Sequence, residues 1–460
     1  MISLGGITAI VISGVIIVYC MVQKKHDDFK MCFLKISIIV SMFFQVGYVL
    51  KLNFLITYER FFLILYLAIA IENALFYKIK IQYKTVLFAT FSTLISVITL
   101  MSLLIYPERI ETFNPNGIAD FDSVFEGKMG LDYLEFHSHN ITSLLEVIIF
   151  FTISILSYDI FSKKEKVYDL LLFLRKTFYV YFFIAVLETI FNNLISNELI
   201  RQLILSYLGN QEDYVNTFLN VVARYGFYGF LGFFKEPAYA SAICIVFYGL
   251  EYIMGIKGKK EKYFHFLCFF VLIFSGSTTG IFLIPFGLFI SCREIIKSEG
   301  VLNKICNAIP IMIILGLFSL VYSFYSKELD FLSEAIYLKL ISLLTAEDMG
   351  SFMSASGAAR SYGNIVAYRA FLSAPIWGIG LGSITATGLI SSFLATFGIL
   401  GVIVWLLFVK NAFCIRIHSK NLLLLLIFGF YFMAMYSVSF LYSPMMISIY
   451  LLFNKFNYDK

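Results

Sequence analysis

Thirteen apolar stretches of this chain are candidate membrane spans. A membrane span needs about 20 mostly apolar residues, because the hydrocarbon core of a bilayer is about 30 Å thick. The predicted spans are residues 3–22, 31–50, 60–77, 85–105, 141–161, 177–195, 237–255, 263–275, 279–292, 305–324, 385–408, 421–439 and 442–454. The pairs 263–275/279–292 and 421–439/442–454 contain short spans joined by tight turns, so each pair is either a tilted hairpin or a single bent span. We therefore predict an all-α, polytopic integral membrane protein with about 13 transmembrane helices, within a range of 11–14.

The composition also requires lipid as the solvent. Hydrophobic residues make up 60% of the chain and charged residues 14%, whereas a soluble domain carries about 25% charged residues. These values exclude a disordered chain, a disulfide scaffold and a free cytosolic enzyme. No linker and no fixed-period repeat divides the sequence, so residues 1–460 are expected to form a single membrane domain.

Lysine and arginine are distributed unequally between the two sides of the membrane. The connections on one side hold 23 basic residues: 23–30, 78–84, 162–176, 256–262, 293–304, 409–420 and 455–460. Those on the opposite side hold 11. Because cytoplasmic loops are enriched in lysine and arginine, the N-terminus is predicted to lie outside and the C-terminus in the cytoplasm.

Three long segments fall on the predicted outer side: 106–140, 192–236 and 325–384. Long loops are usually functional, so we expect binding or chemistry at the outer surface. The first loop is acidic and contains two histidines, but no metal-ligand spacing is completed and no metal site is predicted. Its last residue begins a glycosylation sequon, Asn140-Ile-Thr142, which adjoins a span and supports no prediction.

The second outer loop ends in an arginine, glycines interleaved with aromatic residues, and a carboxylate. The run is Arg224-Tyr-Gly-Phe-Tyr-Gly-Phe-Leu-Gly-Phe-Phe-Lys235-Glu236-Pro237-Ala-Tyr239-Ala. Pro237 is expected to open the next span, because proline is favoured in the first turn of a helix. Glu236 then stabilises the helix dipole, or it is a functional carboxylate that faces a cavity. Glu188, near the outer end of its own span, is a candidate for the same cavity.

The third outer loop carries two arginines and a run of glycines. Arg360, Asn364 and Arg369 precede the pattern Gly378-x-Gly380-x-Gly382. The two arginines are nine residues apart, which is 900° of helix, so an unbroken helix would point them to opposite faces. Either Gly363 breaks the helix or only one arginine reaches the site. The glycine run has no strand–helix context, so we reject a dinucleotide fingerprint.

Arginines on an outer membrane face have two common roles. They contact lipid headgroups while their stems lie along apolar surface. Alternatively, the guanidinium fork binds a diphosphate through paired hydrogen bonds. The sequence leaves both roles open for Arg224, Arg360 and Arg369.

Three motifs follow one another over about residues 224–408. The first is the run from Arg224 to Ala240, and the second is Phe274-Ser-Gly-Ser-Thr-Thr-Gly280 at a hairpin tip. The third is Arg360 fifteen residues before Pro375, then the glycine run, then a span containing Phe397-Gly-Ile-Leu-Gly401. In order and spacing these motifs resemble the bacterial O-antigen polymerase family, whose pattern overlaps with that of the O-antigen ligases. No histidine follows the last glycines between Ser383 and Ser392, which favours a polymerase over a ligase.

The resemblance implies an all-helical, GT-C-like glycosyltransferase at the outer face of the bacterial cytoplasmic (inner) membrane. Such an enzyme transfers a growing glycan from undecaprenyl diphosphate to a sugar hydroxyl of the next lipid-linked repeat unit. The product would be O-antigen, capsule or exopolysaccharide, and no cofactor or metal would be needed. The expected partners are the donor and acceptor glycolipids, membrane lipids and a chain-length regulator, with no nucleic acid.

The resemblance also implies roles for residues in the motifs. Glu236 is expected to act as the base and Arg360 as the main diphosphate ligand, with Arg224 and Arg369 supporting. Lys235, Tyr239 and Asn364 are expected to contact the diphosphate or a sugar.

Two other activities and one non-enzymatic role are the alternatives. An O-antigen ligase transfers the finished glycan to lipid A core. A flippase moves the same glycolipids across the membrane, but it would spread polarity through its spans and keep short outer loops. A receptor or assembly partner would perform no chemistry.

Overall fold

The computed structural model describes part of the chain. The described residues are 2–23, 26–43, 48–51, 55–76, 81, 83–105, 111–112, 132–133, 136, 138–158, 164–194, 199–208, 240–241, 243–244, 267–268, 270–275, 280, 284, 300, 312, 337–338, 341, 352–384 and 389–413. They are mostly helical (87%), which confirms the all-α prediction at that level. The chain separates into two compact units: Met1–Ile69 with Glu165–Leu332 and His418–Ala434, and Ala70–Lys164 with Ser333–Ile417 and Met435–Lys460. The single membrane domain stays a prediction.

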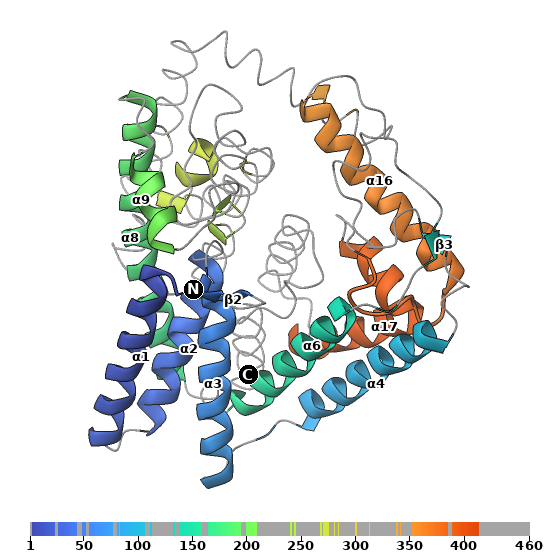
Figure 1. Ribbon diagram of the computed structural model, residues 1–460, viewed down its shortest axis with the longest axis horizontal. Coiled ribbons are helices and arrows are strands. Elements are labelled where there is room, and N and C mark those ends of the chain that lie inside the picture. Colours follow the sequence, from blue (N-terminus) through green and yellow to red (C-terminus); the bar gives the residue numbers. More distant parts are fainter. Residues whose placement is uncertain are drawn as a thin grey trace. The chain divides into compact units, whose positions relative to one another are not determined.

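The first unit contains a group of N-terminal helices and a short hairpin (Figure 1). Its elements are α1 (Leu4–Gln23), α2 (His26–Phe43), β1 (Tyr48–Lys51), β2 (Leu55–Thr57), most of α3 (Tyr58–Phe76), α8 (Lys164–Leu194) and α9 (Leu199–Leu208). β1 and β2 pair antiparallel, with Tyr48 opposite Thr57 and Lys51 opposite Leu55. α1 packs against α2, β1 and α9.

The second unit contains four long helices and a second short hairpin (Figure 1). Its elements are α4 (Tyr83–Ile105), β3 (Glu111–Thr112), β4 (Asp132–Tyr133), α6 (Ser138–Leu156), α16 (Phe352–Ser373) and α17 (Leu389–Phe413). β3 and β4 pair antiparallel. α4 packs against α6 and α17, while α16 packs along α17 and contacts β3. Elements from the first and third predicted outer loops therefore meet within this unit.

Seven of the predicted spans coincide with described helices: 3–22, 31–50, 60–77, 85–105, 141–161, 177–195 and 385–408. The spans 421–439 and 442–454 lie outside the described residues, as do most residues of 237–255, 279–292 and 305–324. The prediction of about 13 helices is therefore tested only for part of the chain.

Two predicted boundaries differ from the structure. α2 ends at Phe43, and the end of the predicted span 31–50 belongs to β1. α8 begins at Lys164, so most of the predicted cytoplasmic connection 162–176 continues the helix. Lysine and glutamate are good helix formers, and Glu165 in the first turn of α8 complements the helix dipole. The basic residues of 162–176 therefore did not indicate a loop, because most of this segment is helical.

α4 buries several polar residues and exposes a stripe of large apolar ones. Ser96 and Thr99 are buried, and the Ser96 hydroxyl donates to the Ser92 carbonyl oxygen at 2.7 Å. The exposed apolar side chains form a stripe along the helix: Leu87, Phe91, Leu94, Val97, Met101 and Leu104. A surface helix of a water-soluble protein has the opposite arrangement. α6 likewise buries polar residues, Asn140 and Ser154, and exposes large apolar ones, Ile141, Leu145 and Ile148.

Two of the described helices are long and apolar enough to cross a membrane: Thr85–Ile105 within α4 and Tyr168–Phe191 within α8. Less than half of each is buried inside the protein (39% and 35%). Three shorter apolar helices accompany them: Leu4–Tyr19, Asn140–Leu156 and Ile390–Val404.

Four segments that the lysine and arginine pattern assigns to the outer side meet at one end of the first unit. The Ser3 amide donates to the Val49 carbonyl oxygen of β1 at 3.3 Å. The Ser3 hydroxyl donates to the Tyr48 carbonyl oxygen (2.5 Å) and pairs with the Tyr58 hydroxyl at the start of α3 (3.1 Å). Gly5 lies so close to α9 that a Cβ there would stand 2.9 Å from the Tyr207 carbonyl oxygen.

Lys35, which lies inside a predicted span, has an acidic partner in the first unit. Its ammonium group forms an ion pair with the carboxylate of Asp169 in α8. The same ammonium nitrogen lies 5.2 Å from the centre of the Phe173 ring, within the range of a cation–π contact. The charge within α2 is thus compensated by α8, as charged residues within spans usually are.

Candidate functional site

The residues 374–384, here called the glycine loop, connect α16 toward α17 and contain the third motif's glycines. Gly378, Gly380 and Gly382 have φ angles of +74°, +95° and +71°. Glycine adopts positive φ without the steric penalty that a Cβ imposes. The alternating spacing therefore reflects three left-handed positions, which explains the glycines without any nucleotide.

α17 is interrupted at Gly398, where φ is +62° and ψ is −168°. Such a break frees carbonyl oxygens in the helical turn that precedes it. The glycine loop supplies donors for two of them: the Ile379 amide donates to the Ala395 oxygen at 2.7 Å, and the Gly380 amide donates to the Thr396 oxygen at 3.1 Å. The first half of α17 is therefore capped by backbone from the loop.

The second half of α17 is capped by the same loop from the other side. The Ile399 amide donates to the Pro375 carbonyl oxygen (2.9 Å), and the Leu400 amide donates to the Ile376 carbonyl oxygen (3.3 Å). Free amides at a helix start are a common anion site. Here two first-turn amides already have backbone acceptors, so anion binding nearby would depend on side chains.

Close backbone contact explains why glycines recur in this region. A Cβ on Gly398 would lie 2.4 Å from the Ile376 carbonyl oxygen, and one on Gly378 would lie 2.5 Å from the Thr396 carbonyl group. Real Cβ atoms do not approach backbone that closely, because repulsion rises steeply at such distances. Gly378 and Gly398 thus allow the glycine loop to approach the break in α17 closely.

Asn140 holds the glycine loop from the first turn of α6. It is fully buried, and its side-chain nitrogen donates to the Leu381 carbonyl oxygen (2.6 Å) and to the Ser383 hydroxyl (2.9 Å). Both amide hydrogens are used. The sequence marked this residue only as part of a glycosylation sequon, and nothing local in the sequence reveals a partner 241 residues away.

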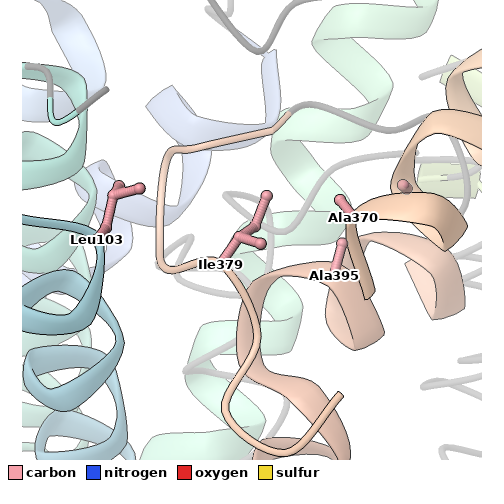
Figure 2. Close-up of a cluster of buried hydrophobic side chains, with 5 residues drawn as sticks. Leu103, Ala370, Ile379 and Ala395 are labelled. Carbon is pink, nitrogen blue, oxygen red and sulfur yellow. The ribbon is translucent and has the colours of Figure 1, made fainter. Parts of the chain in front are cut away.

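A small apolar cluster packs the loop against three helices. Figure 2 shows Ile379 of the glycine loop among Leu103 of α4, Ala370 of α16 and Ala395 of α17. Ala367 completes the cluster. Three of the five residues are alanine, which lets the helix backbones approach closely, as small residues do between membrane helices.

α16 runs unbroken from Phe352 to Ser373, so Gly363 does not interrupt it. Arg360 and Arg369 therefore occupy opposite sides of one helix, which leaves only one of the two to face a common site. Gly363 and Ala367 are buried, whereas Arg369 is exposed. The side chain of Arg360 lies outside the described part of the chain.

Asn364 contacts the start of α17. Its side-chain oxygen accepts a hydrogen bond of 2.7 Å from the Ser391 hydroxyl. Position 360 is one helical turn earlier, within about 40° of Asn364 around the axis. Position 360 is therefore on the side of α16 that carries this contact, and Asn364 helps to fix α16 on α17.

In the first unit, the residue that follows the first motif contacts the second motif. The Ser241 hydroxyl, one residue beyond the first motif, donates to the Ser275 hydroxyl of the second motif at 2.9 Å. Both serines are buried. A Cβ on Gly280 would lie 2.4 Å from the Ser275 oxygen and 2.9 Å from the Ser241 oxygen, so the glycine makes room for the pair.

The remaining predicted site residues are only partly described. Arg224, Lys235, Glu236 and Tyr239 lie outside the described residues. Glu188 is buried in α8 of the first unit, at 3% exposure. Within the described ranges, no three His, Cys, Asp or Glu residues form a group that could hold a metal ion.

No family model matches this chain, and no curated protein or solved structure is significantly similar to it. The resemblance to O-antigen polymerases therefore rests on the three motifs. The second motif contacts Ser241, the residue that follows the first motif, within the first unit. The parts of the third join within the second unit, through the glycine loop and the break in α17.

Proposed function

We propose that this chain is a multi-pass membrane glycosyltransferase that polymerises lipid-linked oligosaccharide repeat units at the outer face of a bacterial cytoplasmic membrane. The observation that carries the proposal is the joining of the third motif's parts. The glycine loop caps both halves of α17 at Gly398, and the arginine-bearing α16 leads directly into that loop. In lipid, an interrupted helix is tolerated where protein covers it or where it lines a cavity, and such breaks often mark binding sites.

The membrane location is supported by the arrangement of polar and apolar residues. α4 and α6 bury hydroxyl and amide groups and expose apolar stripes, as helices in lipid do. The proposed orientation is supported by the meeting of Ser3, β1, the start of α3 and α9, which the charge pattern assigns to the outer side. The proposed membrane domain has about 13 helices and a GT-C-like arrangement, with its C-terminus in the cytoplasm.

The diphosphate of the donor lipid would be bound by side chains. Two amides at the start of the second half of α17 already donate to carbonyl oxygens of the glycine loop, so they are not available to an anion. Arg360 is the proposed main ligand, with Arg224 supporting, because a guanidinium pairs with two phosphate oxygens at once. One donor aimed at developing charge contributes about 3–4 kcal/mol to transition-state stabilisation.

In the proposed reaction a sugar hydroxyl of the acceptor attacks the anomeric carbon of the donor glycan. A new glycosidic bond forms, the bond from that carbon to the diphosphate oxygen breaks, and undecaprenyl diphosphate leaves with the bonding electrons. Glu236 accepts the hydroxyl proton as general base, and the arginines stabilise the charge on the leaving diphosphate. The step needs no metal and no nucleotide.

Deleting the gene and sizing the lipid-linked and surface glycans tests the activity. A surface carrying a single repeat unit supports a polymerase. Full-length polymer that accumulates without transfer to lipid A core would instead indicate a ligase, and repeat units retained on the cytoplasmic side would indicate a flippase. Unchanged glycans would remove all three activities. Complementation with the intact chain controls for effects on neighbouring genes.

A further inference from the structure

One side of α16 and the turn after it form an exposed, mainly apolar surface, here called the α16 stripe. Its members are Ile365, Tyr368, Arg369, Leu372, Ile376 and Trp377. Tyr368, Leu372 and Ile376 are each more than half exposed (53%, 57% and 55%). Among the helical members, Tyr368 and Arg369 lie three and four residues after Ile365, and four and three before Leu372, so all four line a single face.

The opposite side of α16 is the packed side. Gly363, Ala367 and Ala370 are buried, and Ala367 and Ala370 belong to the cluster with Ala395 of α17. At about 100° per residue, Arg369 lies at one edge of the stripe, about 180° from position 360. α16 is thus two-sided, with one arginine position on each side.

The stripe is an unusual surface for a loop in water. The sequence assigns segment 325–384 to the outer side of the membrane, where an apolar face left in water would be hydrated at a free-energy cost. Three features favour lipid as its occupant. Tyr368 and Trp377 are the residue types that concentrate at the membrane–water interface. Arg369 provides the positive charge that lipid phosphates attract. α4 and α6 of the same unit expose apolar stripes as well.

We propose that the α16 stripe lies on the outer surface of the bilayer, at the boundary between headgroups and acyl chains, with Arg369 at the height of the phosphates of bilayer lipids. The apolar members then enter the acyl region while the guanidinium reaches the headgroups. The proposal assigns Arg369 to the bilayer and leaves Arg360, on the other side, for a bound substrate. It does not depend on the reaction that the chain catalyses.

The chain contains only two tryptophans, Trp377 and Trp405, so a Trp405→Phe variant leaves Trp377 as the single reporter. The full-length variant would be reconstituted into phosphatidylcholine–phosphatidylglycerol vesicles. Lipids brominated near the headgroup or near the chain end, and iodide in the buffer, would serve as quenchers. We expect strong quenching by the shallow bromines, weaker quenching by the deep ones, and little by iodide.

Two results would overturn the proposal. Quenching by iodide without quenching by brominated lipid would put the stripe in water. Resistance to both kinds of quencher would mean that protein, such as a second copy of the chain, covers it. A normal size-exclusion profile for Trp405→Phe in detergent ensures that the reporter variant is folded.

Arg369 is tested by charge reversal in the same background. Arg369→Glu should repel lipid phosphates and raise iodide quenching of Trp377 at least twofold in vesicles rich in phosphatidylglycerol, with a smaller rise in pure phosphatidylcholine. Arg60→Glu, the same reversal at an exposed helix position in the first unit, is the matched control and should leave quenching unchanged. Equal responses to the two reversals would exclude a phosphate contact at Arg369.

Discussion

α4 and α17 lie in contact within the same unit, yet they satisfy their backbone in different ways. α4 is continuous over 23 residues, and its buried hydroxyls bond to carbonyl oxygens of their own helix. α17 is broken at Gly398, and its freed groups bond to the glycine loop. A continuous apolar helix needs no other segment, whereas a broken one depends on a specific partner. Substitutions should therefore have small effects on α4 and large effects wherever the loop meets α17.

The largest effect is expected for Gly398→Val. The Gly398 conformation (φ +62°, ψ −168°) is essentially restricted to glycine and costs a residue with a side chain about 1–3 kcal/mol. A Cβ at 2.4 Å from the Ile376 oxygen would also displace the loop, whose four backbone hydrogen bonds to α17 contribute about 1 kcal/mol each. We expect a loss of about 5 kcal/mol, measured by thermal unfolding in detergent.

Gly14→Val is the matched control for that substitution. Gly14 lies in α1 with nothing within 4 Å of its Cβ position, and valine has a slightly higher helix propensity than glycine. Its unfolding temperature should hardly change. A similar loss at both glycines would show that the break in α17 needs no glycine, and the comparison with α4 would fail.

The next effect concerns activity. It tests whether Arg360 of α16 and Glu236 take part in the proposed reaction. Arg360→Lys should slow polymerisation about 100-fold, which is about 3 kcal/mol, because an ammonium cannot pair with two phosphate oxygens at once. Glu236→Gln should slow it by a similar factor, because an amide cannot accept the proton. Initial rates with reconstituted protein and lipid-linked repeat units provide the measurement.

Arg369→Lys is the control for Arg360→Lys, since it makes the same change on the opposite side of α16. It should keep nearly full polymerisation. If Arg360→Lys and Glu236→Gln both kept full polymer length, the assignment of these two residues would be wrong. If Arg369→Lys alone were inactive, Arg369 and not Arg360 would be the diphosphate ligand.

A third, smaller effect is expected where α6 holds the glycine loop. Asn140→Ala removes both donors to the loop and leaves the Leu381 oxygen and the Ser383 hydroxyl buried without them. An unsatisfied buried group costs about 1–3 kcal/mol, so we expect a loss of about 2 kcal/mol in unfolding experiments.

Thr142→Ala separates this structural role from the sequon. It abolishes the pattern Asn140-Ile-Thr142 but leaves the Asn140 amide in place, and Thr142 is exposed. Its stability should match that of the unmodified chain. Equal losses for Asn140→Ala and Thr142→Ala would contradict the idea that the amide holds the loop.

The sequence was sufficient for the continuous helices but not for the broken one. Apolar runs predicted α1, α4 and α6, because such a run folds as a helix in lipid without help from other segments. Nothing in the run from Leu389 to Phe413 distinguishes Gly398, which breaks its helix, from Gly14, which does not. The difference comes from the glycine loop, which begins 24 residues before Gly398.

The candidate site was predictable to a similar extent. The spacing of Arg360 and Arg369 predicted opposite faces only for an unbroken helix and left a break at Gly363 open; α16 is regular through Gly363. The role of Asn140 could not be predicted, since it depends on Leu381 and Ser383 in a distant segment. Motif order therefore indicates which segments carry the site, whereas the contacts between them require the fold.

The smallest expected effect concerns two buried serines, Ser96 in α4 and Ser383 in the glycine loop. Ser96 donates to a carbonyl oxygen of its own helix, so Ser96→Ala leaves that oxygen with its helical amide and should change stability by less than about 0.5 kcal/mol. Ser383 accepts a hydrogen bond from Asn140, so Ser383→Ala should cost about 1 kcal/mol. A double-mutant cycle with Asn140→Ala should show coupling for Ser383 and none for Ser96. Coupling at neither serine would mean that the loop is held by its backbone bonds alone.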